Sequence, residues 1–291
     1  MERIAVIGAG FMGSGIAQVC AQAGYAVTLI DVTEERLGFA RNAIAWSLDK
    51  LENKEQLDAP ASVVADRIQT STGYSAARDA ELVIEAVYED RETKRNAIRT
   101  LDGICRSDAI IGSNTSTIPI TQLAAASRHP ERVIGIHFFG PVPLMRLVEI
   151  TPTPTTSQSV IDTVIDFGRS VGKNPVLVKK DVPGFLMNRI FGAMTCEAIR
   201  LVEDGVGSIE DIDQGMCDGF NFRVGPLCIA DLAGLDIALN AFQVMHDLDP
   251  SRMPAPPALL KRMVGEGKLG AKSGEGFYRW EKNGKRLGPA F

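Results

Sequence analysis

Apolar runs rich in β-branched residues alternate with helically spaced segments from the start of the chain to Asp181. Each run is short and bounded by turn-forming residues, which is the pattern of buried parallel strands joined by helices. The runs span residues 4–7, 27–30, 82–86, 109–112, 133–138, 147–150 and 176–178. They predict an α/β unit with a mostly parallel sheet covered by helices. The charged stretch from Val32 to Gln69 is longer than an ordinary crossover and predicts a helical hairpin inserted in this unit.

The pattern changes after Val182, where no comparable strand run is expected. The apolar spacing becomes helical over residues 185–204, 209–216, 227–245 and 258–264. We therefore predict a first domain over residues 1–182 and an all-α second domain over residues 183–291. The first helix of the second domain presents more than one apolar surface, with Leu186, Ile190 and Met194 among its residues, so we expect this domain to form a homodimer.

The composition describes a globular chain of 291 residues, of which 45% are hydrophobic, enough for a sizeable core. Its 31 Lys and Arg residues against 36 Asp and Glu residues give a net charge of -5, which does not favour nucleic acid as a partner. No run of about 18 apolar residues predicts a membrane span, and the first residues lack the pattern of a secretory leader. The five cysteines include no Cys-x-x-Cys pair, so we expect the reducing cytoplasm and neither a disulfide framework nor a metal site.

A glycine-rich motif, Gly8-x-Gly10-x-x-Gly13, directly follows the first predicted strand and opens a helix. In this context Gly8 permits the tight turn, Gly10 lets the backbone approach a pyrophosphate, and Gly13 lets the helix pack on the strand. Asp31 ends the next strand, where its carboxylate would accept hydrogen bonds from the adenosine ribose and repel a 2′-phosphate. The sequence therefore predicts a Rossmann-like domain that binds NAD rather than NADP. A glycine-rich turn without a ligand is the alternative.

Two apolar runs flank a turn rich in glycine and proline between His137 and Glu149. Pro143 lies midway between these residues, so antiparallel pairing across the turn places His137 opposite Glu149. A histidine facing a carboxylate is a polarised general base, because the carboxylate fixes the tautomer and stabilises the imidazolium. The other histidines, His129 and His246, are interpreted as surface residues without such a partner. A purely structural pair is the alternative, although the end of a strand in a nucleotide-binding sheet favours catalysis.

Further motifs follow in order along the chain: residues 81–90 with Lys94, residues 113–116, residues 183–189, residues 225–227 and residues 270–278. Together with the glycine motif and the segment from His137 to Glu149, they resemble the 3-hydroxyacyl-CoA dehydrogenase family, in particular its short bacterial 3-hydroxybutyryl-CoA members. The resemblance covers nearly the whole chain. It implies an NAD-dependent oxidoreductase that interconverts a short-chain 3-hydroxyacyl-CoA and its 3-ketoacyl-CoA by hydride transfer.

The resemblance also implies catalytic roles for single residues. His137 would act as acid and base with Glu149 as its partner. Ser116 and Asn188 would hydrogen-bond the reacting oxygen or the acyl carbonyl of the substrate, a contribution of the oxyanion-hole kind. Taken alone, Ser116 also fits the cap of a helix that begins near Pro119, and Asn188 also fits a solvated residue in the first turn of a helix.

The implied cofactor contacts extend beyond the glycine motif. Glu89 and Lys94 would contact the nicotinamide-side ribose and phosphates, although both also fit a solvated charged face. In full, the implied contacts of NAD are Gly8, Gly10, Phe11, Met12, Gly13, Asp31, Glu89, Lys94 and Asn114.

Three positions depart from the pattern of the family. Gly140 stands where the family usually has asparagine, which leaves space and removes one amide that faces the substrate. Acidic residues dilute Lys50 and Lys54 where short members often carry a lysine cluster for the CoA phosphates. Arg223 stands where proline is common, ahead of a helix expected to border the substrate cleft. It would grip a carboxylate there, or it is a surface arginine at a helix start.

These departures keep two further interpretations open. In one, the same fold and catalytic residues act on a small carboxylate-bearing substrate without CoA, such as the formyl-pyridine carboxylic acid of vitamin B6 degradation. Gly140 would then leave room for the ring, and Arg223 would hold the carboxylate. In the other, the chain is a non-catalytic, crystallin-like structural protein, and the intact set of Ser116, His137, Glu149 and Asn188 argues against it.

Overall fold

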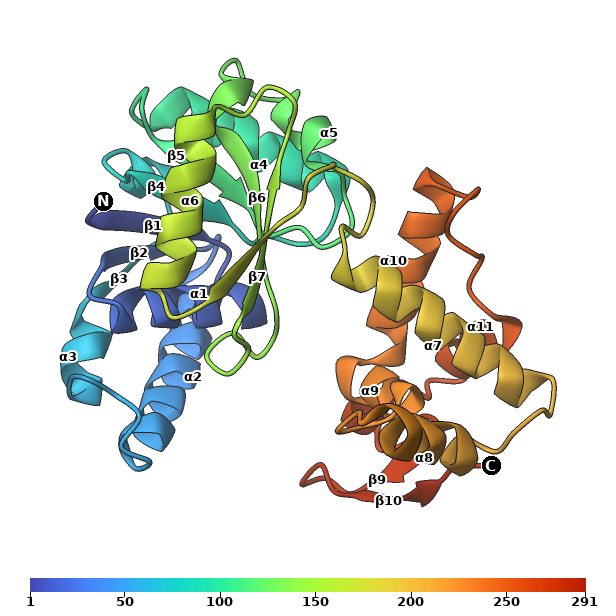
Figure 1. Cartoon of the computed structure of the whole chain (residues 1–291). Coiled ribbons are helices and arrows are strands. Elements are labelled where there is room, and N and C mark those ends of the chain that lie inside the picture. The colour runs from blue at the N-terminus through green and yellow to red at the C-terminus, as the bar shows by residue number, and fades with distance from the viewer. The chain divides into compact units, whose positions relative to one another are not determined.

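The computed structural model describes all 291 residues, which form two compact units, Met1–Val182 and Pro183–Phe291. The first unit is α/β and the second is helical (Figure 1). No single helix has the length and apolar character needed to cross a bilayer. The helices Pro226–Ala233 and Leu235–Leu248 reach that length and apolar character only when taken together, and they are bent by 101° at the break between them.

An eight-stranded sheet forms the centre of the first unit, in the order β3-β2-β1-β4-β5-β6-β7-β8. The strands β1 to β6 run parallel, β7 is antiparallel to β6, and β8 is parallel to β7. The prediction of a mostly parallel α/β sheet is confirmed. The strands are β1 (Arg3–Ile7), β2 (Ala26–Ile30), β3 (Ile68–Ser71), β4 (Leu82–Glu85), β5 (Ile110–Ser113), β6 (Val133–Phe138), β7 (Leu147–Pro152) and β8 (Asn174–Leu177).

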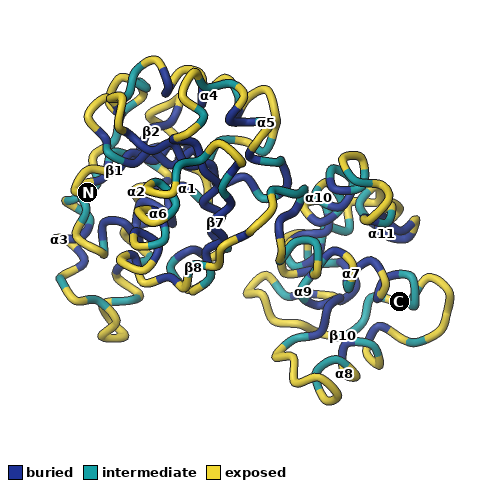
Figure 2. Tube along the Cα trace, turned by 45° about the horizontal axis from the view of Figure 1, so that its top comes forward, coloured by how far each residue is buried: buried dark blue, intermediate teal, exposed yellow.

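The helices of this unit follow from the strand pattern. The central strands read as continuous apolar runs because they are buried on both faces, as the dark trace in Figure 2 shows. One core cluster joins strand residues to α1, α2 and α6, so these helices cover the same face. The helices are α1 (Phe11–Gln22), α2 (Glu34–Glu52), α3 (Ala61–Asp66), α4 (Arg91–Ile104), α5 (Ile120–Ala124) and α6 (Gln158–Ser170).

The inserted helical hairpin consists of α2 and α3, which pack together. It begins at a side-chain cap, because Thr33 accepts a hydrogen bond from the backbone N–H of Arg36. The hairpin ends earlier than the sequence predicts, because Ile68 and Gln69 already belong to β3. Strand β3 lies at the edge of the sheet and is only half-buried, so its polar residues gave no apolar run from which to predict it.

The second unit is helical as predicted, with two differences. The expected helix over residues 227–245 is two helices, because Gly234 has a φ of 99° that no helix accommodates. A short hairpin of β9 (Tyr278–Trp280) and β10 (Arg286–Pro289) adds strands that the sequence pattern did not indicate. The helices are α7 (Met187–Glu203), α8 (Ile209–Phe220), α9 (Pro226–Ala233), α10 (Leu235–Leu248) and α11 (Ala258–Gly265).

Two buried aspartates explain the last two sequence motifs of this unit. A Cβ at Gly225 would collide with Asp213, and one at Gly276 would collide with Asp231, so glycine is required at both positions. The hydrogen bonds that Asp231 accepts would lower its pKa, but burial outweighs them and raises it. Asp213 accepts from the N–H groups of Leu227 and Cys228 and the Tyr278 hydroxyl, and Asp231 accepts from the N–H groups of Phe277 and Tyr278 and the Trp280 indole.

Candidate active site

The glycine motif forms the turn between β1 and α1. Gly8 has a φ of 100°, and a Cβ there would lie 2.5 Å from the carbonyl oxygen of Ala86. A Cβ at Gly13 would collide with the carbonyl group of Gly8, whereas a Cβ at Gly10 would meet nothing within 4 Å. The outer glycines are therefore needed for the turn itself, and Gly10 faces the open space that close approach of a pyrophosphate requires.

Asp31 fixes this turn from the end of β2. Its buried carboxylate accepts hydrogen bonds from the N–H groups of Ala9 and Val32, both at 2.7 Å, and the guanidinium of Arg36 lies 3.7 Å away. A cavity of about 460 Å³ lies between the turn and the ends of β2 and β4, and Gly10, Asp31 and Arg36 line it with Phe11, Met12 and Val87. A helix N-terminus and a ribose-binding carboxylate at one cavity fit a dinucleotide such as NAD.

His137 and Glu149 lie opposite each other on β6 and β7. The Nδ1 atom of His137 is 2.8 Å from Oε2 of Glu149, and the two residues are 5% and 0% exposed. The ring of Phe139 packs against the imidazole of His137, with 4.4 Å between the two ring centroids. A buried carboxylate on Nδ1 holds the ring and favours its Nδ1–H tautomer, in which Nε2 is the ring nitrogen able to accept a proton.

The other two histidines differ from the sequence interpretation. His129 is exposed as predicted but does have an acidic neighbour, since its Nδ1 lies 3.3 Å from Oε1 of Glu131. His246 is half-buried, with Nδ1 2.8 Å from the carbonyl oxygen of Met253. Neither is a buried histidine–carboxylate pair like that of His137.

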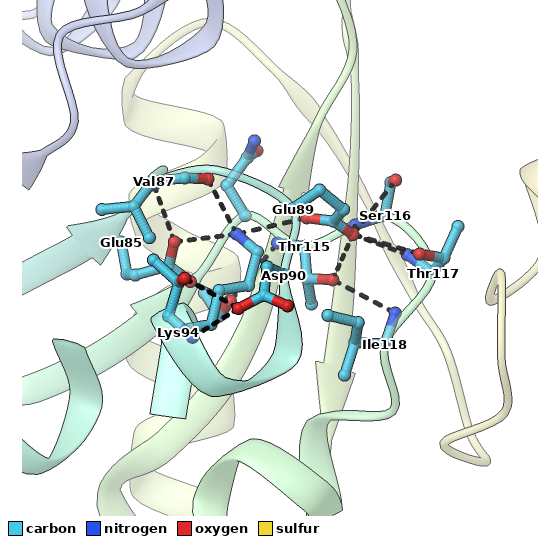
Figure 3. A network of polar contacts seen from close by, with 12 residues as sticks. Glu85, Val87, Glu89, Asp90, Lys94, Thr115, Ser116, Thr117 and Ile118 are labelled. Atoms are coloured by element: carbon cyan, nitrogen blue, oxygen red, sulfur yellow. Dashed lines mark hydrogen bonds and ion pairs between the residues drawn. The ribbon is translucent and has the colours of Figure 1, made fainter. Parts of the chain in front are cut away.

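Ser116 lies in a loop that follows β5 and is held by one carboxylate, that of Glu89 (Figure 3). Oε1 of Glu89 accepts hydrogen bonds from the N–H groups of Ser116 at 2.9 Å and Thr117 at 3.2 Å, and from the Thr115 hydroxyl at 2.6 Å. The Ser116 hydroxyl is 3.4 Å from the same oxygen. The predicted substrate contact Ser116 and the predicted cofactor contact Glu89 therefore belong to one network.

Lys94, on the first turns of α4, completes this network. It is 1% exposed, and its ammonium is 2.8 Å from Oε1 of Glu85 and 3.2 Å from Oε2 of Glu89 (Figure 3). Burial alone would lower the pKa of Lys94, but the two carboxylates outweigh burial and raise it. Glu85 ends an apolar strand and was not singled out from the sequence, since only its position beside Lys94 reveals it.

Asn114 connects the Ser116 loop to the histidine strand. Its side-chain oxygen accepts a hydrogen bond from the N–H of Phe138 at 2.8 Å, next to His137, and its own N–H donates to the carbonyl oxygen of Glu85. Because β5 and β6 are parallel neighbours, Ser116 and His137 emerge at the same edge of the sheet. Ligands of doubly wound sheets bind at that edge.

Asn188 and Arg223 belong to the second unit, which is described by itself. Asn188 is half-buried in the first turn of α7. Two residues with left-handed backbone, Gly184 (φ 75°) and Phe185 (φ 48°), lie shortly before this helix. Such a conformation is unusual for phenylalanine and occurs where the surroundings enforce it. Arg223 is exposed and lines a polar cavity of about 670 Å³ with Cys228 and Arg286.

A second cavity of the first unit, of about 680 Å³, lies between α1, α2 and the turn 141–144 and is mostly apolar. Lys50 and Lys54 line it, whereas the neighbouring acidic residues Asp49, Glu52, Glu55 and Asp58 do not. Trp46 also lines it, 65% exposed, with the Lys50 ammonium 5.2 Å from its ring centroid. Lys50, on α2, and Lys54, just after this helix, thus line the cavity without these acids, and the dilution expected from the sequence does not extend to it.

The space beside Gly140 is occupied by a side chain of the protein. A Cβ at Gly140 would lie 2.5 Å from Cε1 of Phe11 and 3.3 Å from the sulfur of Met12. Phe11 is 70% exposed and lines both cavities of the first unit. The room that the sequence suggested at Gly140 is therefore taken by the Phe11 ring.

Comparisons with known proteins agree over both units. The family described as 3-hydroxyacyl-CoA dehydrogenase, NAD binding domain, matches residues 3–182, and the C-terminal domain of the same family matches residues 184–280. A probable 3-hydroxybutyryl-CoA dehydrogenase of Deinococcus radiodurans is 43% identical, over 96% of this chain and 100% of that protein.

Two solved structures are informative. The structure of (S)-3-hydroxybutyryl-CoA dehydrogenase from Ralstonia eutropha has a TM-score of 0.91 and 39% identity, covering 97% of this chain and 99% of that chain. The structure of an NAD⁺-dependent 5-formyl-3-hydroxy-2-methylpyridine 4-carboxylic acid 5-dehydrogenase has a TM-score of 0.79 and 33% identity, covering 98% and 92%.

Proposed function

Since the chain belongs to the 3-hydroxyacyl-CoA dehydrogenase family and is thereby an NAD-dependent dehydrogenase acting on a CH–OH group, we propose that it interconverts short-chain 3-hydroxyacyl-CoA and 3-ketoacyl-CoA. The observation that carries the proposal is the buried contact of 2.8 Å between His137 and Glu149. It lies at the carboxyl edge of the sheet that also holds the glycine turn and Asp31. An acid–base pair beside a dinucleotide cavity is what alcohol oxidation by hydride transfer needs.

In the proposed mechanism the side chains handle the proton and the developing charge. NAD, when bound, supplies the acceptor of the hydride. Neutral His137 takes the hydroxyl proton at Nε2, and Glu149 stabilises the imidazolium that forms. Ser116 and Asn188 would hydrogen-bond the oxygen as its charge changes. In the reverse direction the imidazolium returns the proton to the forming alkoxide.

The apolar cavity supports an acyl-CoA as the substrate. Its aromatic and aliphatic walls would hold an adenine or pantetheine group, and Lys50 and Lys54 place positive charge where CoA phosphates would lie. Both features occur in the unit that carries His137.

A pyridine carboxylic aldehyde is the second candidate substrate, because a dehydrogenase for such a compound is 33% identical to this chain with a TM-score of 0.79. One contact weighs against it. The Phe11 ring occupies the space beside Gly140 that the substrate ring was expected to use.

Steady-state assays distinguish the two candidates. Acetoacetyl-CoA with NADH is expected to turn over with a kcat/KM within the usual range of about 10⁴ to 10⁸ M⁻¹s⁻¹. Negligible turnover, together with rapid oxidation of the pyridine aldehyde acid by NAD, would reverse the assignment.

The lysines of the apolar cavity provide a more specific test. The variant Lys50→Gln/Lys54→Gln should raise the KM for acetoacetyl-CoA several-fold and leave it unchanged for acetoacetyl-pantetheine, which lacks the nucleotide phosphates. The exposed Lys282, in the second unit, provides the matched control Lys282→Gln, for which neither KM should change. Equal effects on both substrates would contradict a phosphate contact.

We propose that the chain acts as a homodimer in the cytoplasm. Helices of the second unit expose large apolar side chains, with Ile190 at 62%, Ile237 at 60% and Leu232 at 55% exposure, which a second copy would cover. All five cysteines are free thiols, and a reducing compartment keeps thiols in this state. Sedimentation velocity should give a dimer, and a monomer at micromolar concentration would refute that part of the proposal.

A further inference from the structure

The turn 141–145 joins the strand of His137 to the strand of Glu149, and its residues 141–144 form one wall of the apolar cavity. We infer that Lys173 is a positioning residue that holds this turn by its backbone carbonyl groups and thereby determines how tightly the acyl-CoA binds, without touching substrate or cofactor. The inference deepens the proposed function and rests on it, because it takes the apolar cavity as the binding site of the CoA group.

Lys173 lies directly before β8, and its ammonium contacts the backbone of the turn. The residue is 6% exposed, and its Nζ donates hydrogen bonds to the carbonyl oxygens of Val142 at 2.5 Å and Met145 at 2.9 Å. The next residue adds a third bond, because the N–H of Asn174 donates to the carbonyl oxygen of Arg146 at 2.6 Å. Lys173 does not itself line the cavity, so it acts on the cavity wall only through the turn.

The carbonyl oxygens of the turn, rather than a carboxylate, accept the hydrogen bonds of the Lys173 ammonium. Burial of an ammonium costs free energy unless polar groups of the protein replace the lost water. Burial lowers the pKa of Lys173, and of the titratable groups only the Cys20 thiol acts in the opposite direction. An aliphatic side chain would fill the same space without this cost, so the contribution specific to the ammonium is its pair of hydrogen bonds to the turn.

Helix α1 packs closely on the same turn. A Cβ at Gly15 would lie 2.8 Å from Cβ of Val142, which is closer than real Cβ contacts. Within the turn, the N–H groups of Leu144 and Met145 both donate to the carbonyl oxygen of Pro141. The cavity wall is thus fixed by contacts from two elements, and a loss of the ammonium or an added methyl group on α1 would each displace it.

The first measurement is hydrogen exchange of the turn, which needs no substrate. Lys173→Met keeps an unbranched apolar side chain and removes the charge and the donors. In this variant the N–H groups of Leu144 and Met145 should exchange about tenfold faster than in the wild type, because the turn opens more often. The N–H groups of β6 and β7 should keep their exchange rates. This measurement tests the hold on the turn independently of the proposed function.

The second measurement is steady-state turnover of acetoacetyl-CoA with NADH. Lys173→Met should raise the KM for acetoacetyl-CoA about three- to tenfold and leave kcat within about twofold, because a loss of binding shared by ground state and transition state changes KM alone. The Kd of NADH, titrated by its fluorescence without acyl substrate, should stay within about twofold of the wild type.

Two further variants act on the same turn. Gly15→Ala displaces it from α1 and should also raise the KM for acetoacetyl-CoA, and the double variant with Lys173→Met should raise KM by less than the product of the single effects. Lys173→Gln retains a donor group, and it replaces Lys173→Met if that variant does not fold, with every expected change in the same direction.

Asp102→Asn is the matched control for a general loss of stability. The partners of Asp102 are Ser127, Arg128 and Arg132, none of which lines the apolar cavity. This variant should lower the melting temperature and leave both the exchange of the turn and the KM for acetoacetyl-CoA unchanged.

Each contrary result has a separate meaning. Unchanged exchange of the turn in Lys173→Met would overturn the inference, because the ammonium would not hold the turn. Faster exchange with an unchanged KM would also overturn it, because the turn would not determine the binding of acyl-CoA. A fall in kcat or in NADH affinity with an unchanged KM would assign the effect to the catalytic pair or the cofactor and overturn it as well. If the wild type does not turn over acetoacetyl-CoA, the proposed function fails and the role of Lys173 in acyl-CoA binding fails with it, whereas the exchange rates still report whether Lys173 holds the turn.

Discussion

Replacing Glu149 with glutamine tests the proposed acid–base pair most directly. The substitution keeps the size of the side chain and an oxygen that accepts the Nδ1–H of His137, so it removes a charge and little else. Glu149 is 0% exposed, and its Oε2 lies 2.8 Å from Nδ1 of His137. Because the pair is shielded from water, solvent does not replace the lost charge.

The size of the effect follows from the separation of the charges. Opposite unit charges about 4 Å apart attract by about 4 kcal/mol at an effective dielectric constant of about 20. That attraction is lost in the state where His137 carries the proton. Since about 1.36 kcal/mol corresponds to a tenfold change in rate, and the charge on His137 is only partly developed in the transition state, we expect kcat to fall about 10²- to 10³-fold for Glu149→Gln. The Kd of NADH should not change, because the substitution lies outside the dinucleotide cavity.

The assay is NADH oxidation in the presence of acetoacetyl-CoA, with NADH fluorescence titration beside it. Glu131→Gln is the matched control, since Glu131 contacts the exposed His129 at 3.3 Å and should leave the rate unaltered. A loss of less than about threefold for Glu149→Gln, or a loss found in NADH affinity instead of kcat, would refute the acid–base assignment.

Three other substitutions test separate parts of the structure. Gly140→Asn brings a Cβ within 2.5 Å of the Phe11 ring, but this ring is 70% exposed and can turn aside, so the melting temperature should not change; a clear fall would show that the ring is fixed beside Gly140. Asp31→Ser should raise kcat/KM with NADP relative to kcat/KM with NAD by about tenfold or more. The carboxylate that repels a 2′-phosphate is then absent, and the Arg36 guanidinium, 3.7 Å from that carboxylate in the wild type, remains. An unchanged ratio would contradict the role of Asp31 in selecting NAD. Burial alone would raise the pKa of Asp102, but its hydrogen bonds outweigh burial and lower it, so its stabilisation is present above the ordinary pKa of about 4 and is lost as the pH falls. Melting temperatures of Asp102→Asn should therefore fall less steeply with acid than those of the wild type, and parallel curves would refute the linkage.

The sequence predicted the sheet well wherever strands are buried on both faces. Strands β1, β4 and β6 are continuous apolar runs, and their positions agree with the prediction within one residue. Strand β3 was not predicted, because it lies at an edge of the sheet and only Ile68 of its four residues is apolar. The break between α9 and α10 at Gly234 was not predicted either, because the apolar spacing continues on both sides of this residue and only its backbone angle reveals the bend.

For the site, spacing around a turn was informative and charge along a helix was not. The symmetric positions of His137 and Glu149 about Pro143 predicted their register, and the structure has the same register. Their catalytic role, and those of Ser116 and Asn188, stay predictions. Without the resemblance, the charged residues around Lys94 indicated a solvated face. The burial of Lys94 could not be predicted, because it depends on the ion pair with Glu85, which is nine residues away on β4. Lys50 and Lys54 likewise appeared diluted by their acidic neighbours, because sequence order does not show which of these side chains line the cavity.

The two buried aspartates of the second unit also bear on how the protein is made. Asp231 on α9 is satisfied only by backbone and indole groups from Phe277 to Trp280, almost fifty residues later. During synthesis α9 leaves the ribosome before these partners do, so the carboxylate stays hydrated until they follow. The first unit can close while the chain is growing, whereas the second can complete its core only after Trp280 has left the exit tunnel.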